Sequence, residues 1–226
     1  MVNRRNKSEK KKLQKPNLPL QQLKRDLPAD DLQDHEYYVQ LHLLSDDLSG
    51  QEVSRISFDQ ILFEQVRMNN TQFKGVQLLD TRITGSDLAN ARWTDANFHR
   101  VEFISCHLTG FQAAEARFQD VLFKECAGHF AQYALAVFES VRFEQCDLSE
   151  ANFYQANLPG AVFVDCDLSQ ADFSGAKMVG ADLRGCKIEG IRVGPRELQG
   201  ATIDPAQALA LVQAMGITIK APEESF

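Results

Sequence analysis

The 226-residue chain has 24 Lys and Arg against 31 Asp and Glu, so its formal net charge is −7, and 44% of its residues are hydrophobic. No run of about 18 apolar residues occurs and no apolar segment follows the basic N-terminus, which excludes a membrane-spanning helix and a secretory signal. The five cysteines are an odd number, which favours reduced thiols and predicts a cytoplasmic protein.

Residues 1–36 are expected to form a basic, disordered tail. Residues 1–25 carry nine Lys and Arg and one acid, a net charge of +8, which leaves −15 for the rest of the chain. Pro16, Pro19 and Pro28 interrupt the segment. A solvated tail is the favoured interpretation; the alternative is an electrostatic arm that binds nucleic acid weakly.

A short alternating segment follows the tail. Within the stretch EYYVQLHLL, Val39, Leu41 and Leu43 alternate with other residues, as in a strand with one buried face. We expect this segment to form the first strands of a domain that extends over residues 37–204.

The domain is dominated by a repeat of five residues. From Leu48 to Ile203, 30 of the 32 positions spaced by five carry a large apolar residue, and 12 of the 15 Phe lie on this series. Small residues are favoured two positions earlier, and 10 of the 13 Gly fall two positions later. Residues two apart point the same way in a strand, and Gly suits a turn because it accepts a positive φ. The period therefore predicts a short extended side and a turn in each unit.

This pattern resembles that of the pentapeptide-repeat proteins, in which the motif is A(D/N)LXX. The stretches ANFYQANLPG, CDLSQADFSGAKMVGADLRG and SDLANARWTDANF carry the resemblance. It implies an all-β fold, a right-handed quadrilateral parallel β-helix in which four repeat units make each square coil. The 32 units then make about eight coils, or a rod of roughly 38 Å at a spacing of ~4.8 Å.

The cysteines follow the same frame. Cys106, Cys126, Cys146, Cys166 and Cys186 recur at every fourth repeat unit, so they form one column at the small inward position. A column of small buried side chains is the favoured interpretation. A zinc site needs four converging ligands, and parallel Cβ vectors suit a disulfide poorly. We therefore predict no metal or cofactor.

One region departs from the repeat. A bend or bulge is expected between residues 111 and 135, since bulk is missing at two large positions there. Either Phe111 fills the space over Gly128, or the backbone bulges and Phe130 enters the core. A packing repair is favoured over an interaction site around His129, Phe130 and Leu135. The residues of this irregular region are Phe111, Ala113, Gly128, His129 and Phe130.

The C-terminal residues 205–226 are predicted to form a helical cap and tail. Asp204 is a plausible N-cap before Pro205, and Gly216 ends the helix. Such a cap protects the open end of the last coil. The resemblance also implies a homodimer through this cap. The residues expected to cover the last coil or to form the dimer contact are Leu209, Val212, Met215 and Ile217.

An acidic corner is the clearest functional candidate. Its residues map to one corner of the implied square over three adjacent coils, where their field would attract a basic groove. The alternatives are that Asp is favoured in turns for its own hydrogen bonds, or that the acids serve solubility. The acidic corner consists of Glu125, Glu144, Asp147, Glu150, Asp165 and Asp167.

No catalytic motif is found: the chain has no phosphate-binding loop, no HExxH and no nucleophile elbow. We therefore expect a protein that is not an enzyme. The resemblance implies a DNA-mimicking protein that binds DNA gyrase or topoisomerase IV and modulates or protects it against a quinolone or a toxin. The alternative is a protein–protein interaction scaffold with an unrelated partner.

Overall fold

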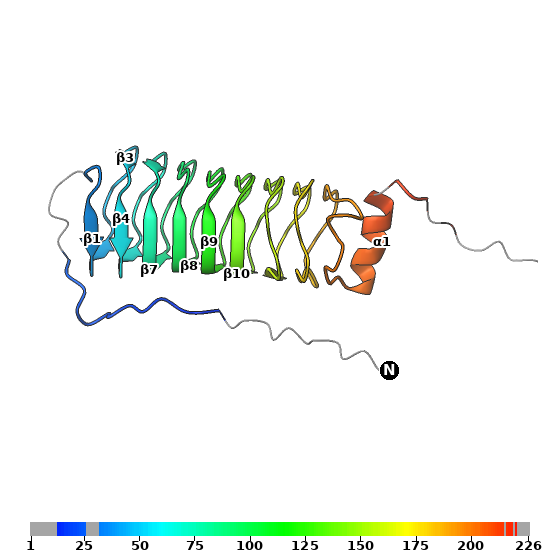
Figure 1. Ribbon diagram of the computed structural model, residues 1–226, viewed down its shortest axis with the longest axis horizontal. Coiled ribbons are helices and arrows are strands. Elements are labelled where there is room, and N and C mark those ends of the chain that lie inside the picture. The colour runs from blue at the N-terminus through cyan, green and yellow to red at the C-terminus, as the bar shows by residue number, and fades with distance from the viewer. Residues whose placement is uncertain (1–12, 26–31, 215, 219, 221–226) are drawn as a thin grey trace, which may run out of the picture.

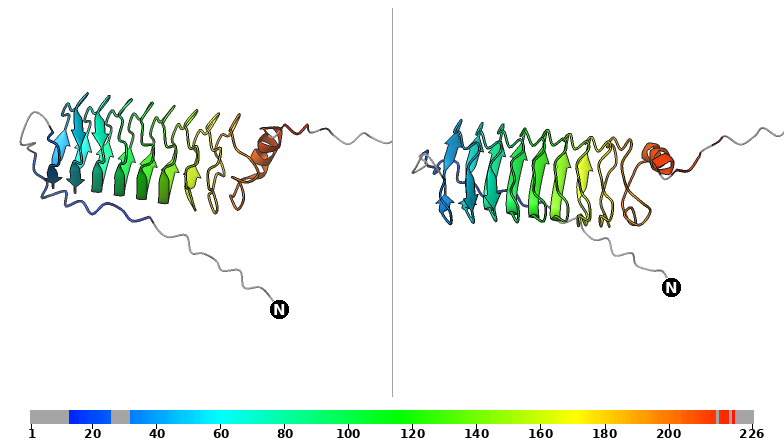
Figure 2. Two further views of the ribbon diagram at one scale, coloured as in Figure 1. Left: turned by 45° about the horizontal axis from the view of Figure 1, so that its top comes forward. Right: turned by 90° about the horizontal axis from the view of Figure 1, so that it is seen from above.

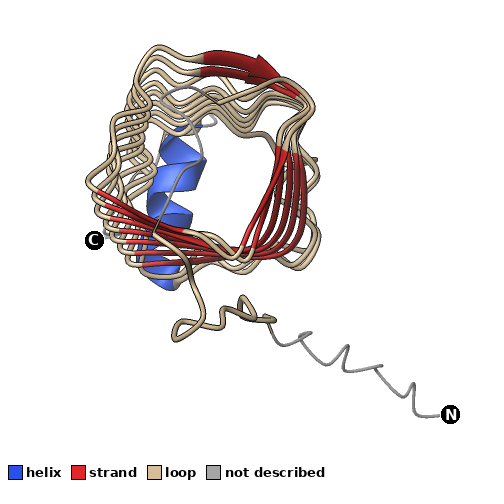
Figure 3. Cartoon of the chain, turned by 90° about the vertical axis from the view of Figure 1, so that its left-hand side faces the viewer, coloured by secondary structure: helices blue, strands red, loops and turns tan. Residues whose placement is uncertain are grey.

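The computed structural model describes residues 13–25, 32–214, 216–218 and 220. The chain winds into a rod of stacked coils, with a single helix across one end (Figures 1 and 2). Seen along its axis the rod is a square, and the strands lie on three of its sides (Figure 3). The elements are β1 Tyr37–Val39, β2 His42–Leu44, β3 Glu52–Ser54, β4 Ser57–Asp59, β5 Leu62–Glu64, β6 Gln72–Lys74, β7 Gln77–Thr84, β8 Asn97–Ile104, β9 Arg117–Lys124, β10 Val137–Glu144, β11 Val162–Val164 and α1 Pro205–Ala214.

The strand pairings are parallel and join equivalent positions in adjacent coils. Phe98 of β8 pairs with Phe118 of β9, which pairs with Phe138 of β10. Single bridges continue the same register from Asp47 to Lys187, through eight successive coils. The predicted fold is confirmed: the chain is a parallel β-solenoid in which four repeat units make each coil.

The four sides of the square are named by their inward residues. Side one includes Leu108 and Leu148, side two Trp93 and Tyr133, side three Phe98 and Phe118, and side four Phe103 and Phe123; all are buried. The strands β7 to β10 run along side three and continue around a corner onto side four.

Left-handed backbone marks each corner. From His35 to Gly200, every residue whose number is a multiple of five has a positive φ, except Pro195. The ten glycines predicted at turns all lie on this series, for example Gly110 at +66°. Most corners are nonetheless occupied by other residues, such as Asp80 at +48°, so stacking must offset the cost of an unfavourable φ there.

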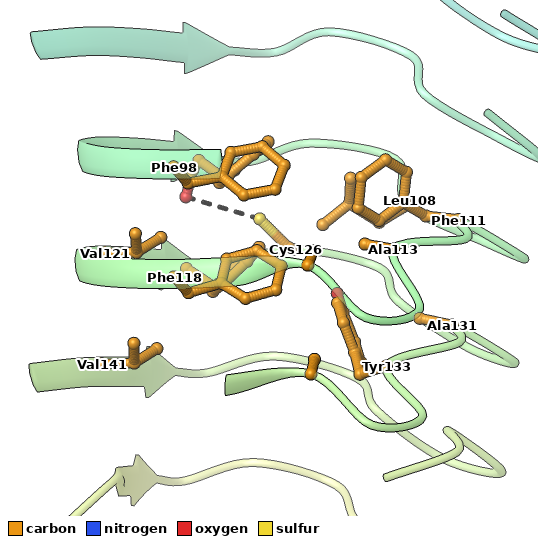
Figure 4. Packing of buried hydrophobic residues seen from close by; sticks show 14 of the residues in the cluster. Phe98, Leu108, Phe111, Ala113, Phe118, Val121, Cys126, Ala131, Tyr133 and Val141 are labelled. Atoms are coloured by element: carbon orange, nitrogen blue, oxygen red, sulfur yellow. Dashed lines mark hydrogen bonds between the residues drawn. The ribbon is translucent and has the colours of Figure 1, made fainter. Parts of the chain in front are cut away.

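Stacked rings fill sides three and four. The Phe98 and Phe118 ring centroids lie 4.6 Å apart, and those of Phe118 and Phe138 lie 4.7 Å apart, with nearly parallel planes. Tyr133 meets the Phe118 ring edge-on at 5.9 Å (Figure 4). The stacking distance matches the spacing of coils, so one ring per coil packs without a gap. Burial of each ring contributes about 2–3 kcal/mol of transfer free energy.

The expected bend or bulge between residues 111 and 135 is absent. Gly128 keeps its ladder hydrogen bond at 2.7 Å. Leu148 of the next coil takes the space, because its Cδ2 lies 3.1 Å from where a Cβ on Gly128 would stand. Phe130 is 45% exposed rather than in the core. Neither the filling of that space by Phe111 nor the bulge that brings Phe130 inward is therefore correct.

Phe111 and Ala113 compensate for each other within one coil. Phe111 is fully buried, and its ring meets Trp93 at 5.5 Å and Tyr133 at 6.4 Å. The bulk missing at Ala113 is thus supplied two residues earlier on the same inward face. A local exchange of large and small residues keeps the coil regular.

The first coil begins one residue earlier than the alternating pattern suggested. Tyr38 is buried and stacks on Phe58 at 5.6 Å, whereas Val39 is 44% exposed. Leu41 and Leu43 are buried, as expected. The prediction for Val39 is wrong because the five-residue frame, and not a period of two, already governs this segment.

The C-terminal helix begins at the predicted cap. The Gln207 N–H donates to Asp204 Oδ1 at 3.0 Å, and the Asp204 N–H donates to Gln207 Oε1 at 2.9 Å. This reciprocal pair is a capping box. The helix ends at Ala214, and Gly216 has a φ of +77°.

The contacts that close the last coil differ from those predicted. Leu211 is buried there, and the Gln207 side chain donates to the carbonyl oxygens of Leu183 and Cys186 at 2.6 and 2.9 Å. Leu209 and Ile217 are each 53% exposed, so the expectation that they cover the coil is wrong. Val212 is half-buried, and Met215 lies outside the described residues.

Residues 13–25 lie along the outside of the rod, although we expected them in a disordered tail. Their path runs beneath the rod from the β1 end toward β9 (Figure 1). We call residues 13–25 the strap. Residues 32–36 of the predicted tail are ordered against the first coil: Leu32 belongs to the buried core, and its N–H donates to Gln51 Oε1 at 2.9 Å. Residues 1–12 and 26–31 lie outside the described residues.

Candidate interaction surfaces

The structure brings five of the six predicted residues of the acidic corner together where side four meets side one. Glu150 was wrongly assigned to it, because Glu150 occupies the next corner, between sides one and two, in the coil after Phe130. Asp147 bridges to Asp167 in the next coil, and the Glu125 N–H donates to the Glu144 carbonyl oxygen at 2.8 Å. Asp147 Oδ1 also accepts the Ser149 N–H at 2.9 Å, which fixes its orientation. The corner is therefore a continuous row of positioned carboxylates.

Three of these five carboxylates have a cationic neighbour. Lys124 Nζ lies 3.4 Å from Glu125, Arg142 pairs with Glu144, and Lys187 Nζ lies 3.2 Å from Asp167. All three pairs are partly exposed, so their attraction is weakened by solvent. The corner remains acidic, but its charge density is lower than the row of acids in the sequence suggested.

The carboxylate of Asp167 is ionised at neutral pH. Burial would raise the pKa of Asp167, but hydrogen bonds from Ser169 and the charge of Lys187 outweigh it and hold the pKa below its usual range. A fixed anion is thus present in the last of the three coils that form the corner.

A second surface is apolar and lies around side two. Phe130 begins this side at one corner, Leu135 ends it at the next, and Tyr154 follows Leu135 in the adjacent coil. Each of the three is nearly half exposed. We call Phe130, Leu135 and Tyr154 the apolar surface. Sequence analysis found Phe130 and Leu135 but missed Tyr154, which occupies an outward position that the repeat does not restrict.

The rings of Phe130 and His129 pack against each other on this surface. Their ring centroids are 3.8 Å apart, and His129 Nδ1 lies 2.8 Å from the Ser149 hydroxyl. His129 Nε2 also lies 3.9 Å from Glu150 in the next coil.

The five cysteines are free, buried and aligned in one column, as predicted. A hydrogen bond to the Cys106 thiol, together with burial, raises the pKa of the Cys126 thiol to about 12. A neutral buried thiol is a poor nucleophile and a poor metal ligand. Among the described residues, no group of three or more His, Cys, Asp or Glu is placed to bind a metal ion.

The strap contacts a groove on the corner between sides three and four. The Asn17 N–H donates to Asp80 Oδ1 at 2.9 Å, and the Gln14 N–H donates to Asp120 Oδ1 at 3.2 Å. Gln60 Nε2 donates to the Asn17 carbonyl oxygen at 3.0 Å. We call Gln60, Asp80, Arg100 and Asp120, which occupy this corner in four successive coils, the strap groove.

An ion pair between buried Asp80 and partly exposed Arg100 lies at the centre of the strap groove. Arg100 binds Asp80 through two hydrogen bonds, both 2.6 Å long. Burial alone would raise the pKa of Asp80, but the bonds from Arg100 and from the Asn17 main chain hold that pKa below its usual range. One feature of the sequence could have indicated this site: of the four successive corner residues, Asp80, Arg100 and Asp120 are charged.

The geometry defines the class of parallel β-solenoids built from five-residue units. The family profile described as pentapeptide repeats matches residues 77–111 and 146–185, in 8 copies. The two matched segments make up about a third of the chain, and over them it carries pentapeptide repeats.

Similar solved structures include other proteins of this kind. HetL from the cyanobacterium Nostoc sp. strain PCC 7120, described as involved in heterocyst differentiation regulation, is 20% identical, with 75% of this chain and 90% of that chain covered and a TM-score of 0.42. A trypsin-treated form of QnrB1, described as a plasmid-mediated fluoroquinolone resistance protein, is also 20% identical, with coverage of 82% and 99% and a TM-score of 0.39. No curated protein matches the chain.

The one helix described has no membrane-spanning character. Within the described part of the chain, no helix is both long enough and apolar enough to cross a bilayer.

Proposed function

We propose that this protein is a non-enzymatic binding rod and that its partners are proteins that dock on its outer faces. The observation that carries the proposal is the filled interior. A single buried cluster of apolar side chains extends from Leu32 to Leu211. Because this cluster fills the interior, a partner can bind only to the outer surface of the rod.

The partner to test first is a type II topoisomerase, DNA gyrase or topoisomerase IV. Support comes from the acidic corner, a row of positioned carboxylates on a rod of roughly 38 Å. Duplex DNA carries one charge per ~1.7 Å, and the ion pairs leave the corner less dense than that. We therefore expect binding in the micromolar range.

The test is a gyrase supercoiling assay with increasing amounts of protein, with and without a gyrase poison. We expect inhibition or protection at micromolar protein, and its loss in a variant with Asp147→Asn, Asp165→Asn and Asp167→Asn. At positions 147 and 167, Asn keeps the Oδ1 acceptor for the N–H of Ser149 and Ser169. At position 165, where φ is +51°, Asn tolerates the left-handed backbone, so the three changes remove charge and preserve the turns.

A matched control changes the same amount of charge elsewhere. Asp95→Asn, Glu115→Gln and Asp172→Asn alter side two and its corner and are expected to retain the effect. Equal loss in both triple variants would indicate a non-specific charge effect. No effect of the natural protein, with the rod shown to be folded by circular dichroism, would reject the topoisomerase proposal.

The apolar surface favours a second candidate, a scaffold for an unrelated protein. Exposed aromatic residues grouped on one face are typical of a contact that is buried in a complex. In this case Phe130→Ser with Tyr154→Ser abolishes capture of the partner, whereas the acidic-corner variant does not. The two variants therefore separate the two candidates.

A homodimer through the C-terminal cap is proposed as well. Leu209 and Ile217 point outward from the cap and leave apolar area unpaired. Sedimentation equilibrium is expected to give twice the mass of the chain, and Leu209→Glu to give the monomer mass by placing a charge in the contact. A natural protein that sediments as a monomer at high micromolar concentration rejects this proposal.

A further inference from the structure

The strap is held in the strap groove through its main chain. The Gln14 N–H donates to Asp120 Oδ1 and the Asn17 N–H donates to Asp80 Oδ1. The Asn17 carbonyl oxygen accepts a hydrogen bond from the side chain of Gln60. None of these three bonds uses a side chain of the strap, so the groove binds an extended chain by its peptide groups.

The side chains of the strap follow a period of three. The partly buried residues between positions 13 and 19 are Leu13, Pro16, Leu18 and Pro19, and the exposed residues are Gln14, Lys15 and Asn17. Leu13, Pro16 and Pro19 are thus spaced by three, which is the number of residues per turn of a polyproline II helix. The two prolines fix φ in the range of that helix. The strap therefore has the sequence pattern of a polyproline II segment with one apolar edge.

The spacing of the groove matches the repeat of such a segment. Asp80 and Asp120 are two coils apart, about 9.6 Å at ~4.8 Å per coil. Gln14 and Asn17 are three residues apart, about 9.3 Å at ~3.1 Å per residue of polyproline II. In a β-strand, groups three residues apart point in opposite directions, so a strand could not use both carboxylates. The groove is therefore spaced for a polyproline II chain.

The strap leaves one buried atom of the groove without a partner. Asp120 is 1% exposed, and its Oδ2 has no hydrogen-bond partner within the described part of the chain. The guanidinium of Arg100, in the preceding coil, is engaged by two hydrogen bonds to Asp80. A buried carboxylate oxygen without a donor is unfavourable, and a cationic donor satisfies it best. The strap is therefore an incomplete ligand for its own groove.

The missing donor belongs at the position of Leu13. The Gln14 N–H lies 3.2 Å from Oδ1 of Asp120, and Leu13 is joined to that N–H by one peptide bond. Leu13 is apolar and gives the carboxylate nothing. A Lys or Arg at this position is long enough to bring its charged head to Oδ2 and to form a charge-assisted hydrogen bond there.

We propose that the strap groove is a binding site for polyproline II segments of partner proteins, and that the strap is the occupant supplied by the chain itself. A segment that displaces the strap has two N–H groups three residues apart, a proline just before the second, and a Lys or Arg just before the first. The additional bond to Asp120 lets it compete with the tethered strap. The inference rests on the proposed function of the rod as a binder of proteins, and it names the kind of segment that one outer corner accepts.

The experiment uses the full-length chain with changes in the strap. Gln14→Pro with Asn17→Pro removes both main-chain donors, keeps charge and length, and is expected to vacate the groove. The matched control, Gln14→Ala with Asn17→Ala, keeps both N–H groups and is expected to keep the strap in place. The probe is a fluorescent peptide of residues 13–20 that carries Leu13→Lys. Fluorescence anisotropy is expected to show saturable binding to the Pro variant that is at least about tenfold tighter than to the Ala control, because two hydrogen bonds hold the strap in the control.

Modified peptides test whether the groove recognises the main chain. N-methylation at Gln14 and Asn17 of the peptide removes the two donors and is expected to weaken binding to the Pro variant at least about tenfold. N-methylation at Lys15 and Leu18, whose N–H groups make no hydrogen bond within the described part of the chain, is expected to have little effect. Equal losses from the two modifications would contradict main-chain recognition.

A double-mutant cycle tests the role of Asp120. The Leu13→Lys peptide is expected to bind the Pro variant about tenfold more tightly than the unchanged peptide, and the two are expected to bind alike once Asp120→Asn is added. A preference for lysine that persists with Asp120→Asn, or no saturable binding of either peptide by the folded Pro variant, would overturn the inference. No topoisomerase takes part, so failure of the supercoiling assay and failure of the peptide to bind are distinguishable.

Discussion

Replacing Phe118 with alanine is expected to lower the free energy of unfolding by about 3–5 kcal/mol. The Phe118 ring is stacked between Phe98 and Phe138 at 4.6 and 4.7 Å and is 1% exposed. Neighbouring coils hold the rings on both sides in place, so the cavity cannot collapse, and the cost lies toward the upper end of the range. Urea unfolding followed by circular dichroism measures the change.

Two control variants separate this effect from a general loss of aromatic residues. Tyr133→Phe removes only a buried hydroxyl that has no hydrogen-bond partner among the described residues, so stability is expected to be unchanged or higher. Phe130→Ala removes a ring that is 45% exposed and is expected to change the free energy of unfolding by less than about 0.5 kcal/mol. If Phe118→Ala and Phe130→Ala cost the same, the ring stack does not stabilise the rod.

The five-residue frame makes most of the fold predictable from the sequence. The position of a residue within its five-residue unit predicts whether it points inward or lies at a corner. The prediction for Val39 was wrong because it was based on a period of two residues instead. The regular coil at Gly128 could not be read from that frame alone, because Leu148 of the next coil supplies the missing contact. The sequence of one coil does not show which side chains of the next coil pack against it.

The surfaces were harder to predict than the core. Lys187 pairs with Asp167 because the two residues occupy equivalent positions in adjacent coils. The partial neutralisation of the acidic corner could therefore have been predicted by placing the Lys and Arg residues, as well as the acids, in the five-residue repeat. The position of the strap could not be predicted, because Gln14 and Asn17 bind through main-chain groups that every residue except proline possesses. Recognition of that kind leaves no pattern in the side chains.

These two surfaces are connected by the direction of the strap. It begins at Asp120, in the same coil as the first residue of the acidic corner, and ends near Gln40 in the first coil. The start of the strap at Gln14 is therefore placed beside the middle of the rod rather than beyond one end. A segment that only capped the first coil would not need to extend over four coils to Asp120.

Replacing Arg100 with methionine is expected to destabilise the rod by about 2–3 kcal/mol at neutral pH and to reverse the pH dependence at Asp80. In the natural chain the pKa of Asp80 is below its usual range, so its contribution is complete above the unfolded-state pKa and is lost as the pH falls through the folded-state pKa. Without Arg100, burial dominates and raises the pKa of Asp80. Its contribution is then lost as the pH rises, and the difference between the two proteins is largest at neutral pH.

Urea unfolding at pH 3 to 7 tests this prediction, with Arg67→Met as the matched control. Arg67 pairs with Asp47 at 2.7 Å, but both side chains are largely exposed, so its loss is expected to leave the unfolding midpoint nearly unchanged at every pH. For Arg100→Met the deficit should shrink as the pH falls through the raised folded-state pKa of Asp80 in the variant and then through its unfolded-state pKa. A deficit that stays constant from pH 3 to 7 would mean that Arg100 stabilises the corner through packing of its carbon chain, and that the charge of Asp80 has no net effect.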